Sequence, residues 1–305
     1  MFDKLPDRVS VYEVAMRDGL QNETVIVPTT KKLRLVEALA ASGLSRIELT
    51  SFVSPKWVPQ LADAEELCEL VDVKHANVTY SALCPNAKGL DRAVATGVPE
   101  VGIFISASET HNKKNVNKTI DETMATFVEV CAAAKQANIR VRGYVSTLWG
   151  CPFEGHIDPK KGLAIAQKLI DLGCYQVSLG DTIGVGTPLQ TRDIVKLFLS
   201  VMRPEQIALH MHDTRGTALA NVVVGLECGV RDFDASIGGL GGCPYAPGAA
   251  GNLATEDLVF TLHGMGVQTG IDLDRLWEAG RVAESVVGRP LPGKVHKAGV
   301  RSLRS

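Results

Sequence analysis

The chain has 305 residues and a formal net charge of −2, and apolar residues make up 45% of it. This length suits one large α/β domain, and the apolar fraction is enough for a sizeable core. The near-neutral charge and the lack of a long basic run give no support to nucleic-acid or anionic-membrane binding. No apolar stretch approaches the length of a membrane span.

The seven cysteines are odd in number and form no Cys-x-x-Cys pair. This pattern argues against a disulfide framework and against a structural zinc cluster. The first ten residues are polar and have neither the apolar segment of a secretion signal nor the Arg/Ser-rich character of a transit peptide. We therefore expect a cytoplasmic protein with reduced thiols.

Short β-branched runs alternate with helical patterns along the whole chain. The predicted strands are 9–17, 46–53, 78–84, 100–106, 140–147, 176–180, 206–212 and 232–237. The predicted helices lie near 30–42, 60–71, 86–97, 120–137, 159–173, 188–202, 216–229 and 254–265. Strands that alternate with helices pair in parallel, and eight such units can close into a barrel. The fold class is therefore α/β, a (β/α)8 TIM barrel over about residues 8–267.

The residues that follow the predicted helices fit this fold. Gly43, Gly97, Gly173 and Gly229 each follow a predicted helix, where glycine tolerates the left-handed conformation that ends it. No linker-like composition divides the chain, so we expect a single domain. A further helical pattern at 273–287 belongs to a C-terminal extension of about 268–305. We expect that extension to pack on the outside of the barrel or on a partner subunit.

A doubly wound open sheet is the main alternative fold. It would normally carry a Gly-x-Gly-x-x-Gly turn after its first strand. The first predicted strand instead ends in Met16-Arg17-Asp18-Gly19, which lacks that glycine spacing. The barrel is therefore the better interpretation.

In barrels of this kind the active site lies at the carboxyl ends of the strands. The polar residues predicted at these ends are Arg17, Asp18, Glu48, Asp181, Thr182, His210 and His212. A glycine-rich loop, 238–252, follows the eighth strand. We expect the chemistry to be built from these side chains.

His210 and His212 are two residues apart on one strand, so their side chains point to the same face. An isolated pair of this kind is more often hydrogen-bonded to its neighbours than bound to a metal. Strands seven, eight and one are adjacent in a closed barrel, however, which brings Asp18 and Asn252 to the same arc. Two imidazoles, a carboxylate and an amide oxygen favour Mg²⁺ or Mn²⁺, with Zn²⁺ and Co²⁺ as alternatives.

Arg17 at the barrel mouth needs an anion or an oxygen acceptor. Neighbouring residues of a strand point to opposite faces, so Arg17 and Asp18 both reach the site only if the strand has ended or is bulged there. Cys243 is either a buried thiol or a proton donor carried in by its loop, and the loop's glycine content favours the donor. Glu48 and Asp181 either orient ligands or form ordinary ion pairs.

Long stretches of the sequence resemble the hydroxymethylglutaryl-CoA lyase family, one of a group of barrel metallolyases that includes isopropylmalate synthase. The stretches are RDGLQNE (17–23), ELTSFVSPKWVPQ (48–60), RGYVS (142–146), SLGDTIGVGTP (178–188) and GLGGCPYAPGAAGNLATED (239–257). Gly19 stands where the condensing synthases usually carry an acidic residue, so the resemblance is to the lyases.

The resemblance implies a divalent cation held by Asp18, His210, His212 and Asn252, with Arg17 beside the thioester oxygen and Cys243 on a mobile loop. It implies that Glu48 supports the site and that Gln21, Tyr144, Asp181 and Thr182 lie near the substrate. The implied reaction is cleavage of 3-hydroxy-3-methylglutaryl-CoA to acetoacetate and acetyl-CoA, as in leucine degradation and ketone-body formation, by a homodimer.

Three points stay open at this stage. The general base is either Asp18 or His210. A related barrel lyase or aldolase would share the site but act on another 3-hydroxyacyl-CoA or on a 2-oxo acid. A non-catalytic acyl-CoA-binding barrel would bind a thioester and release no product.

Overall fold

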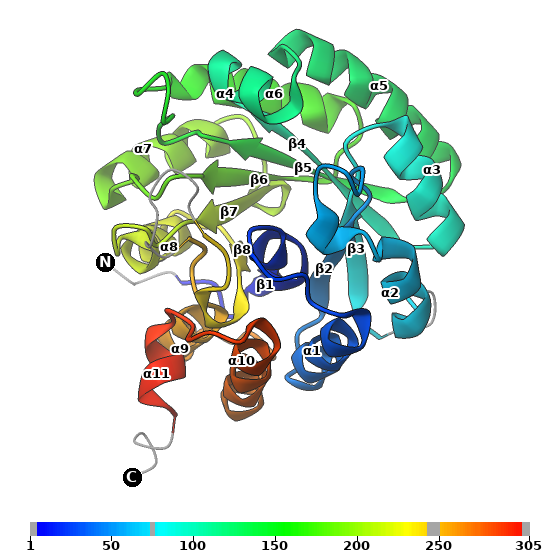
Figure 1. Ribbon diagram of the computed structural model, residues 1–305. Coiled ribbons are helices and arrows are strands. Elements are labelled where there is room, and N and C mark those ends of the chain that lie inside the picture. The colour runs from blue at the N-terminus through cyan, green and yellow to red at the C-terminus, as the bar shows by residue number, and fades with distance from the viewer. Residues whose placement is uncertain (1–4, 74–76, 243–250, 301–305) are drawn as a thin grey trace.

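The computed structural model describes residues 5–73, 77–242 and 251–300. Eight parallel strands form a closed barrel in sequence order, and the last strand pairs with the first (Figure 1). The strands are β1 (Ser10–Glu13), β2 (Arg46–Ser51), β3 (Thr79–Leu83), β4 (Glu100–Ser106), β5 (Arg140–Ser146), β6 (Gln176–Asp181), β7 (Ile207–Met211) and β8 (Asp232–Ala235). The predicted (β/α)8 barrel is confirmed.

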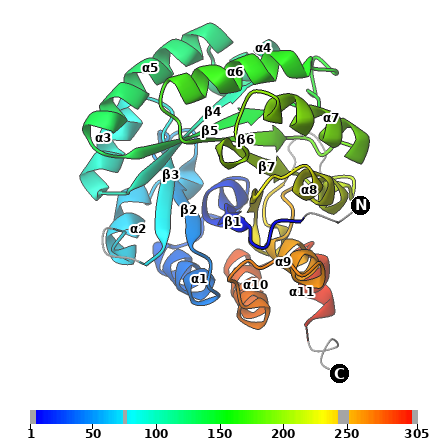
Figure 2. The ribbon, with the colours of Figure 1, turned by 180° about the vertical axis from the view of Figure 1, so that it is seen from behind.

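Helices surround the strands on the outside, as the front and back views show (Figures 1 and 2). The eight that follow the strands are α1 (Thr29–Ala41), α2 (Ala64–Val71), α3 (Ala87–Thr96), α5 (Ile120–Gln136), α6 (Pro159–Asp171), α7 (Pro188–Leu199), α8 (Ala218–Glu227) and α9 (Thr255–Gly264). The four glycines predicted to end helices all have positive φ, between 75° and 103°. None of the described helices is long and apolar enough to cross a membrane.

The C-terminal part of the chain adds two helices to this ring. Helix α10 (Leu273–Val287) packs against both α9 and α1, so it completes the outer layer between the last and first barrel helices (Figure 1). Helix α11 (Lys294–Ala298) packs on α9 and α10. The expected packing of the extension on the outside of the barrel is confirmed.

The structure also corrects the sequence prediction at several places. The first strand is shorter than predicted, because β1 stops at Glu13 and Ala15–Gly19 form a π-helical turn, η1. Helix α4 (Glu109–Val116) was not predicted, since its sequence ETHNKKNV has no apolar periodicity. Short 3₁₀ turns at η2 (Pro59–Leu61), η3 (Pro204–Gln206) and η4 (Ile237–Gly239) were not resolved from the sequence either.

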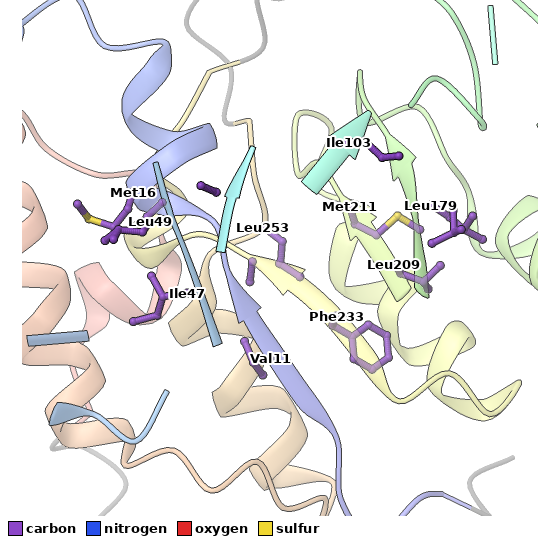
Figure 3. Close-up of a cluster of buried hydrophobic side chains, with 14 of the residues drawn as sticks. Val11, Met16, Ile47, Leu49, Ile103, Leu179, Leu209, Met211, Phe233 and Leu253 are labelled. Carbon is purple, nitrogen blue, oxygen red and sulfur yellow. The ribbon is translucent and has the colours of Figure 1, made fainter. Parts of the chain in front are cut away.

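The apolar core lies between the barrel and its helices. Val11, Ile47, Leu179, Leu209 and Phe233 are at most 3% exposed, and they belong to the cluster drawn in Figure 3. Each side chain of this size stabilises the fold by about 1.5–3 kcal/mol when it is removed from water. Because side chains alternate along a strand, the residues next to these point into the barrel instead.

The barrel interior is polar, with a buried ion pair at its centre. Arg142 of β5 donates to both carboxylate oxygens of Asp234 of β8, at 3.1 and 2.7 Å, and both side chains have no exposed surface. The guanidinium carbon of Arg142 also lies 4.2 Å from the ring centroid of Tyr12 and 5.0 Å from that of Tyr144. Burial by itself raises the pKa of Asp234, but the Arg142 charge and the hydrogen bonds with His210 and Arg142 together outweigh it and hold that pKa well below its usual range.

Candidate active site

The two histidines of β7 converge at the barrel mouth. His210 is the last residue but one of β7, and His212 follows the strand. Their Nε2 atoms are 3.2 Å apart, which confirms that both imidazoles point to one place. His212 is only 7% exposed, and its Nδ1 atom is buried with no hydrogen-bond partner in the part of the chain that the structure describes.

The segment after the β8 loop returns beside these histidines. The Asp213 N–H donates to the carbonyl of Gly251 at 2.7 Å, and the Leu253 N–H donates to that of Met211 at 3.1 Å. These bonds form an antiparallel bridge in which Asn252 faces His212. The backbone therefore fixes Asn252 next to the end of β7.

The two ends of the Asn252 side-chain amide have different surroundings at the site. Its Nδ2 donates to Asp18 Oδ2 at 2.8 Å and to the carbonyl of Leu240 at 3.2 Å. Its Oδ1 is buried and has no hydrogen-bond partner among the described residues. A buried amide oxygen without a partner is costly, so this atom is a candidate ligand for a cation.

The π-helical turn η1 presents Arg17 and Asp18 together. The Gly19 N–H donates to the carbonyl of Val14 at 3.2 Å, which is the i to i+5 bond of a π-helix. The strand has already ended here, so the alternation of side chains no longer separates the two residues. Arg17 Nη1 donates to Asp18 Oδ1 at 2.6 Å, and both side chains reach the mouth.

Together these segments form a group that fits a divalent cation. One donor atom each from Asp18, His210 and His212 lie within 4.8 Å of one another, and Asp18 Oδ2 is 4.0 Å from His210 Nε2. The unpartnered Asn252 oxygen completes a mixed set of nitrogen and oxygen donors. The structure therefore brings together all four residues that the sequence predicted for this site.

The charges at the site favour ligation. Burial raises the pKa of Asp18, but the charges of Arg17, His210 and His212 and the hydrogen bond from Asn252 together outweigh it and lower that pKa to about 2. Burial and the neighbouring His210 lower the pKa of His212 to about 4. At neutral pH Asp18 is thus a carboxylate and His212 a neutral imidazole, the forms that bind metals.

The Glu48 carboxylate orients the Arg17 guanidinium from inside the barrel. Arg17 Nε donates to Glu48 Oε2 at 2.6 Å, and the Tyr144 hydroxyl donates to Glu48 Oε1 at 3.1 Å. The sequence prediction placed Glu48 at the end of its strand, and this is wrong, because Glu48 is the third residue of β2 and has no exposed side-chain surface. Its carboxylate lies inside the barrel and orients the guanidinium, while Arg17 Nη2 forms no hydrogen bond to any described residue.

The remaining predicted residues have different surroundings. Gln21 Nε2 donates to Asp18 Oδ1 at 3.2 Å, directly at the site. The carboxylate of Asp181 accepts from the N–H groups of Val185 and Gly186, at 3.0 and 2.8 Å, so it shapes the turn after β6. Thr182 Oγ1 accepts from the Thr147 N–H at 2.8 Å.

Contacts of Gln21, Tyr144, Asp181 and Thr182 with a substrate stay predictions. Cys243 lies outside the described residues, and its proposed function as a proton donor also stays a prediction.

The sequence did not point to the residues that lie on the Nδ1 side of His210. Its Nδ1 lies 3.2 Å from Asp234 Oδ2, and the Ser178 hydroxyl donates to the same oxygen at 2.7 Å. Arg142 and Asp234 both lie in β-branched runs that read as ordinary strands. The signal that could have found them is a charged residue at the inward position of a buried strand, where it requires a partner.

The fold and the converging side chains define a (β/α)8-barrel protein with a candidate divalent-cation site at the carboxyl ends of its strands. The chain belongs to the HMGL-like family, whose family model matches residues 8–283.

Individual relatives match over almost the entire chain. It is 50% identical to the mitochondrial hydroxymethylglutaryl-CoA lyase of Macaca fascicularis, over 97% of this chain and 91% of that protein. It is 46% identical to the cytoplasmic 3-hydroxy-3-methylglutaryl-CoA lyase of Rattus norvegicus, over 98% of this chain and 87% of that protein. An HMG-CoA lyase from Acinetobacter baumannii, solved with coenzyme A and 3-methylmalate, superposes with a TM-score of 0.92 at 42% identity, covering 98% of this chain and 97% of that one.

Proposed function

We propose that this chain is a divalent-metal-dependent carbon–carbon lyase that cleaves 3-hydroxy-3-methylglutaryl-CoA to acetoacetate and acetyl-CoA. The observation that carries the proposal is the grouping of Asp18, His210 and His212 within 4.8 Å, with the Arg17 guanidinium hydrogen-bonded to Asp18. The relatives of 46–50% identity that are named for this activity support the same reaction.

The cation that fits this site is Mg²⁺ or Mn²⁺, because oxygen and imidazole donors outnumber soft ligands. Asp18, His210, His212 and Asn252 would hold it. When bound, such a cation polarises a coordinated substrate oxygen and makes a hydroxyl group more acidic.

The side chains of this chain supply the remaining steps. A base takes the proton from the substrate's C3 hydroxyl, and Asp18 and His210 are the nearest candidates. The bond between C2 and C3 then breaks, C3 becomes a ketone, and the electron pair passes to the thioester as an enolate. Arg17, held by Glu48, is placed to donate hydrogen bonds to the thioester oxygen as its charge grows. Cys243 would return a proton to C2, which completes acetyl-CoA.

The proposal extends to the residues that contact the substrate. We propose that Gln21, Tyr144, Asp181 and Thr182 contact or lie next to the bound acyl group. Gln21 is hydrogen-bonded to Asp18, and Tyr144 to Glu48, which supports their closeness to the reacting atoms. The coenzyme A complex of the Acinetobacter baumannii relative supports an acyl-CoA as the ligand.

We further propose a homodimer in the cytoplasm, with one catalytic domain made of a barrel at about 8–267 and an extension at about 268–305. The cytoplasmic relative supports the location, although mitochondrial relatives have similar identity. The six described cysteines are all free thiols, as in a reducing compartment. Leucine degradation and ketone-body formation are the pathways that consume or release these compounds.

The proposal is tested by incubating the Mg²⁺-loaded protein with a panel of 3-hydroxyacyl-CoA thioesters and 2-oxo acids. Mass spectrometry should find acetoacetate and acetyl-CoA in equal amounts from the hydroxymethylglutaryl thioester, at a higher kcat/KM than any other product. Faster cleavage of another panel member would identify a related lyase. Thioester binding without any product would identify a non-catalytic barrel.

A further inference from the structure

The imidazole of His210 has two different surroundings on its two nitrogen atoms. Nδ1 lies 3.2 Å from Asp234 Oδ2, inside the barrel. Nε2 faces the mouth, 3.2 Å from His212 Nε2 and 4.0 Å from Asp18 Oδ2. One edge of the ring therefore contacts a buried carboxylate, and the other edge faces the candidate cation site.

The buried carboxylate can only accept hydrogen bonds. Asp234 receives two hydrogen bonds from Arg142 and one from the Ser178 hydroxyl, and its side chain has no exposed surface. A carboxylate paired with a guanidinium is ionised and has no proton to donate. The bond to His210 therefore requires the hydrogen on Nδ1. A neutral imidazole has one N–H only, so Nε2 then carries a lone pair that faces the mouth.

Arg142, which donates to Asp234, is itself held by further contacts. Arg142 also donates through Nε to Gln176 Oε1 at 2.9 Å, and its guanidinium lies over the rings of Tyr12 and Tyr144. Rotation of the Asp234 carboxylate away from His210 would break its hydrogen bonds with Arg142 and Ser178.

The second histidine of the site has no such support. His212 Nδ1 is buried without a hydrogen-bond partner among the described residues. Hydrogen bonding within the described residues therefore favours one tautomer of His210 and neither tautomer of His212.

We propose that Asp234 is a positioning residue that fixes His210 in the Nδ1–H tautomer and so presents Nε2 to the cation. The inference rests on the proposed metal site. Asp234 does not itself reach the substrate or the ion, and it acts through the imidazole. Carboxylates behind metal-binding histidines orient the ring in this way, and their loss weakens metal binding by about 10- to 100-fold.

Asp234→Asn is the substitution that tests the proposal, because it keeps the shape and replaces one acceptor oxygen by an NH₂ donor. Arg142 needs an acceptor, so the amide oxygen should stay on its side and the NH₂ group should face His210. That NH₂ group would donate to Nδ1 and force the hydrogen onto Nε2. Asp232→Asn is the matched control, since Asp232 lies two residues earlier on β8 and pairs with Arg46 at 3.0 Å.

The first readout is the histidine side-chain ¹⁵N NMR spectrum of the metal-free protein at alkaline pH, where imidazoles are neutral. The His210 signals are assigned by their loss in His210→Gln. We expect Nδ1–H in the wild-type protein and in Asp232→Asn, and Nε2–H in Asp234→Asn. An Nε2–H tautomer in the wild-type protein overturns the proposal, whether or not Asp234→Asn folds.

The second readout is the Mn²⁺ dissociation constant, measured by electron paramagnetic resonance. It should rise about 10- to 100-fold in Asp234→Asn and stay at the wild-type value in Asp232→Asn. A folded Asp234→Asn protein with wild-type Mn²⁺ affinity overturns the proposal. Failure of the wild-type protein to bind Mn²⁺ would refute the metal site, whereas the NMR readout judges the tautomer independently.

Discussion

Asn252 and Asp18 lie on segments 234 residues apart in sequence, and the Asn252 Nδ2 atom donates to Asp18 Oδ2 at 2.8 Å. This bond joins the loop after β8 to the π-helical turn after β1 across the closure of the barrel. In this arrangement the amide oxygen of Asn252 is buried, and none of the residues that the structure describes donates a hydrogen bond to it. The candidate cation site therefore depends on barrel closure and on no single element.

Arg17→Gln should fold normally and lose most of its lyase activity. The substitution removes the charged donor that Glu48 and Asp18 hold at the mouth. Loss of such a donor lowers kcat by about 100- to 1,000-fold, or about 2.7–4 kcal/mol. The steady-state kcat measures this effect, with Arg275→Gln on the exposed face of α10 as the control. A kcat near the wild-type value for Arg17→Gln would remove Arg17 from the mechanism.

Cys243→Ala should leave the fold intact and abolish most turnover, because the enolate then has no proton donor on the loop. Cys228→Ala is the matched thiol control, since Cys228 is a free, half-buried cysteine at the end of α8. We expect substrate KM to change little in Cys243→Ala while kcat falls by about 100-fold or more, the lower bound for general acid catalysis. Equal activity of the two variants would show that the thiol is not the donor.

His296 should make stability depend on pH through the extension. The Glu256 carboxylate, 3.6 Å from His296 Nδ1, raises the pKa of that histidine against the opposing effect of burial. A raised pKa stabilises the fold fully below the unfolded value of about 6.5, and the contribution disappears as the pH rises through the folded value. The wild-type protein should therefore exceed His296→Gln in free energy of unfolding by more at pH 6 than at pH 9.

Urea denaturation at the two pH values checks this prediction. His263→Gln is the control of opposite sign, because burial lowers the pKa of His263 and its protonation destabilises the fold. A difference between the wild-type protein and His296→Gln that does not vary with pH would contradict the prediction.

Gly238→Ala should cost more stability than Gly288→Ala. Both glycines have positive φ, 62° and 70°, so alanine costs about 1–2 kcal/mol at either position. A Cβ on Gly288 would meet no atom within 4 Å, whereas one on Gly238 would lie 2.4 Å from Leu291 Cδ1. Leu291 is 1% exposed and has little room to move, so the clash should add about 1–3 kcal/mol.

The midpoints of chemical denaturation of the two variants measure this difference. Equal midpoints would mean that the contact between the extension and the η4 turn does not constrain the fold.

The order and pairing of the strands could be predicted from the sequence because each unit repeats the same local pattern. The turn at Arg17 and Asp18 could not, since VSVYEVAMR has the composition of a longer strand and carries no local signal for a π-helix. Helix α4 is polar except for Val116, so it has no periodic signal. Its N-terminus depends on Ser108, whose side chain accepts from the His111 N–H.

The site itself was predictable to the extent that strand adjacency determines it. Asp18, His210, His212 and Asn252 could be grouped because strands seven, eight and one adjoin in any closed eight-stranded barrel. Asp234 and Arg142 could not be paired, since they lie on β8 and β5, which share no strand-to-strand contact. Their ion pair crosses the barrel interior, and only the three-dimensional packing reveals it.

Isothermal titration of the metal-free protein with Mn²⁺ tests most directly whether one cation is shared by Asp18, His210, His212 and Asn252. We expect one site per chain, weakened at least about 10-fold in both Asp18→Asn and Asn252→Ala, and recovery of lyase activity in step with its occupancy. Absence of Mn²⁺ binding, or wild-type affinity in both variants, would show that these four residues do not share a cation.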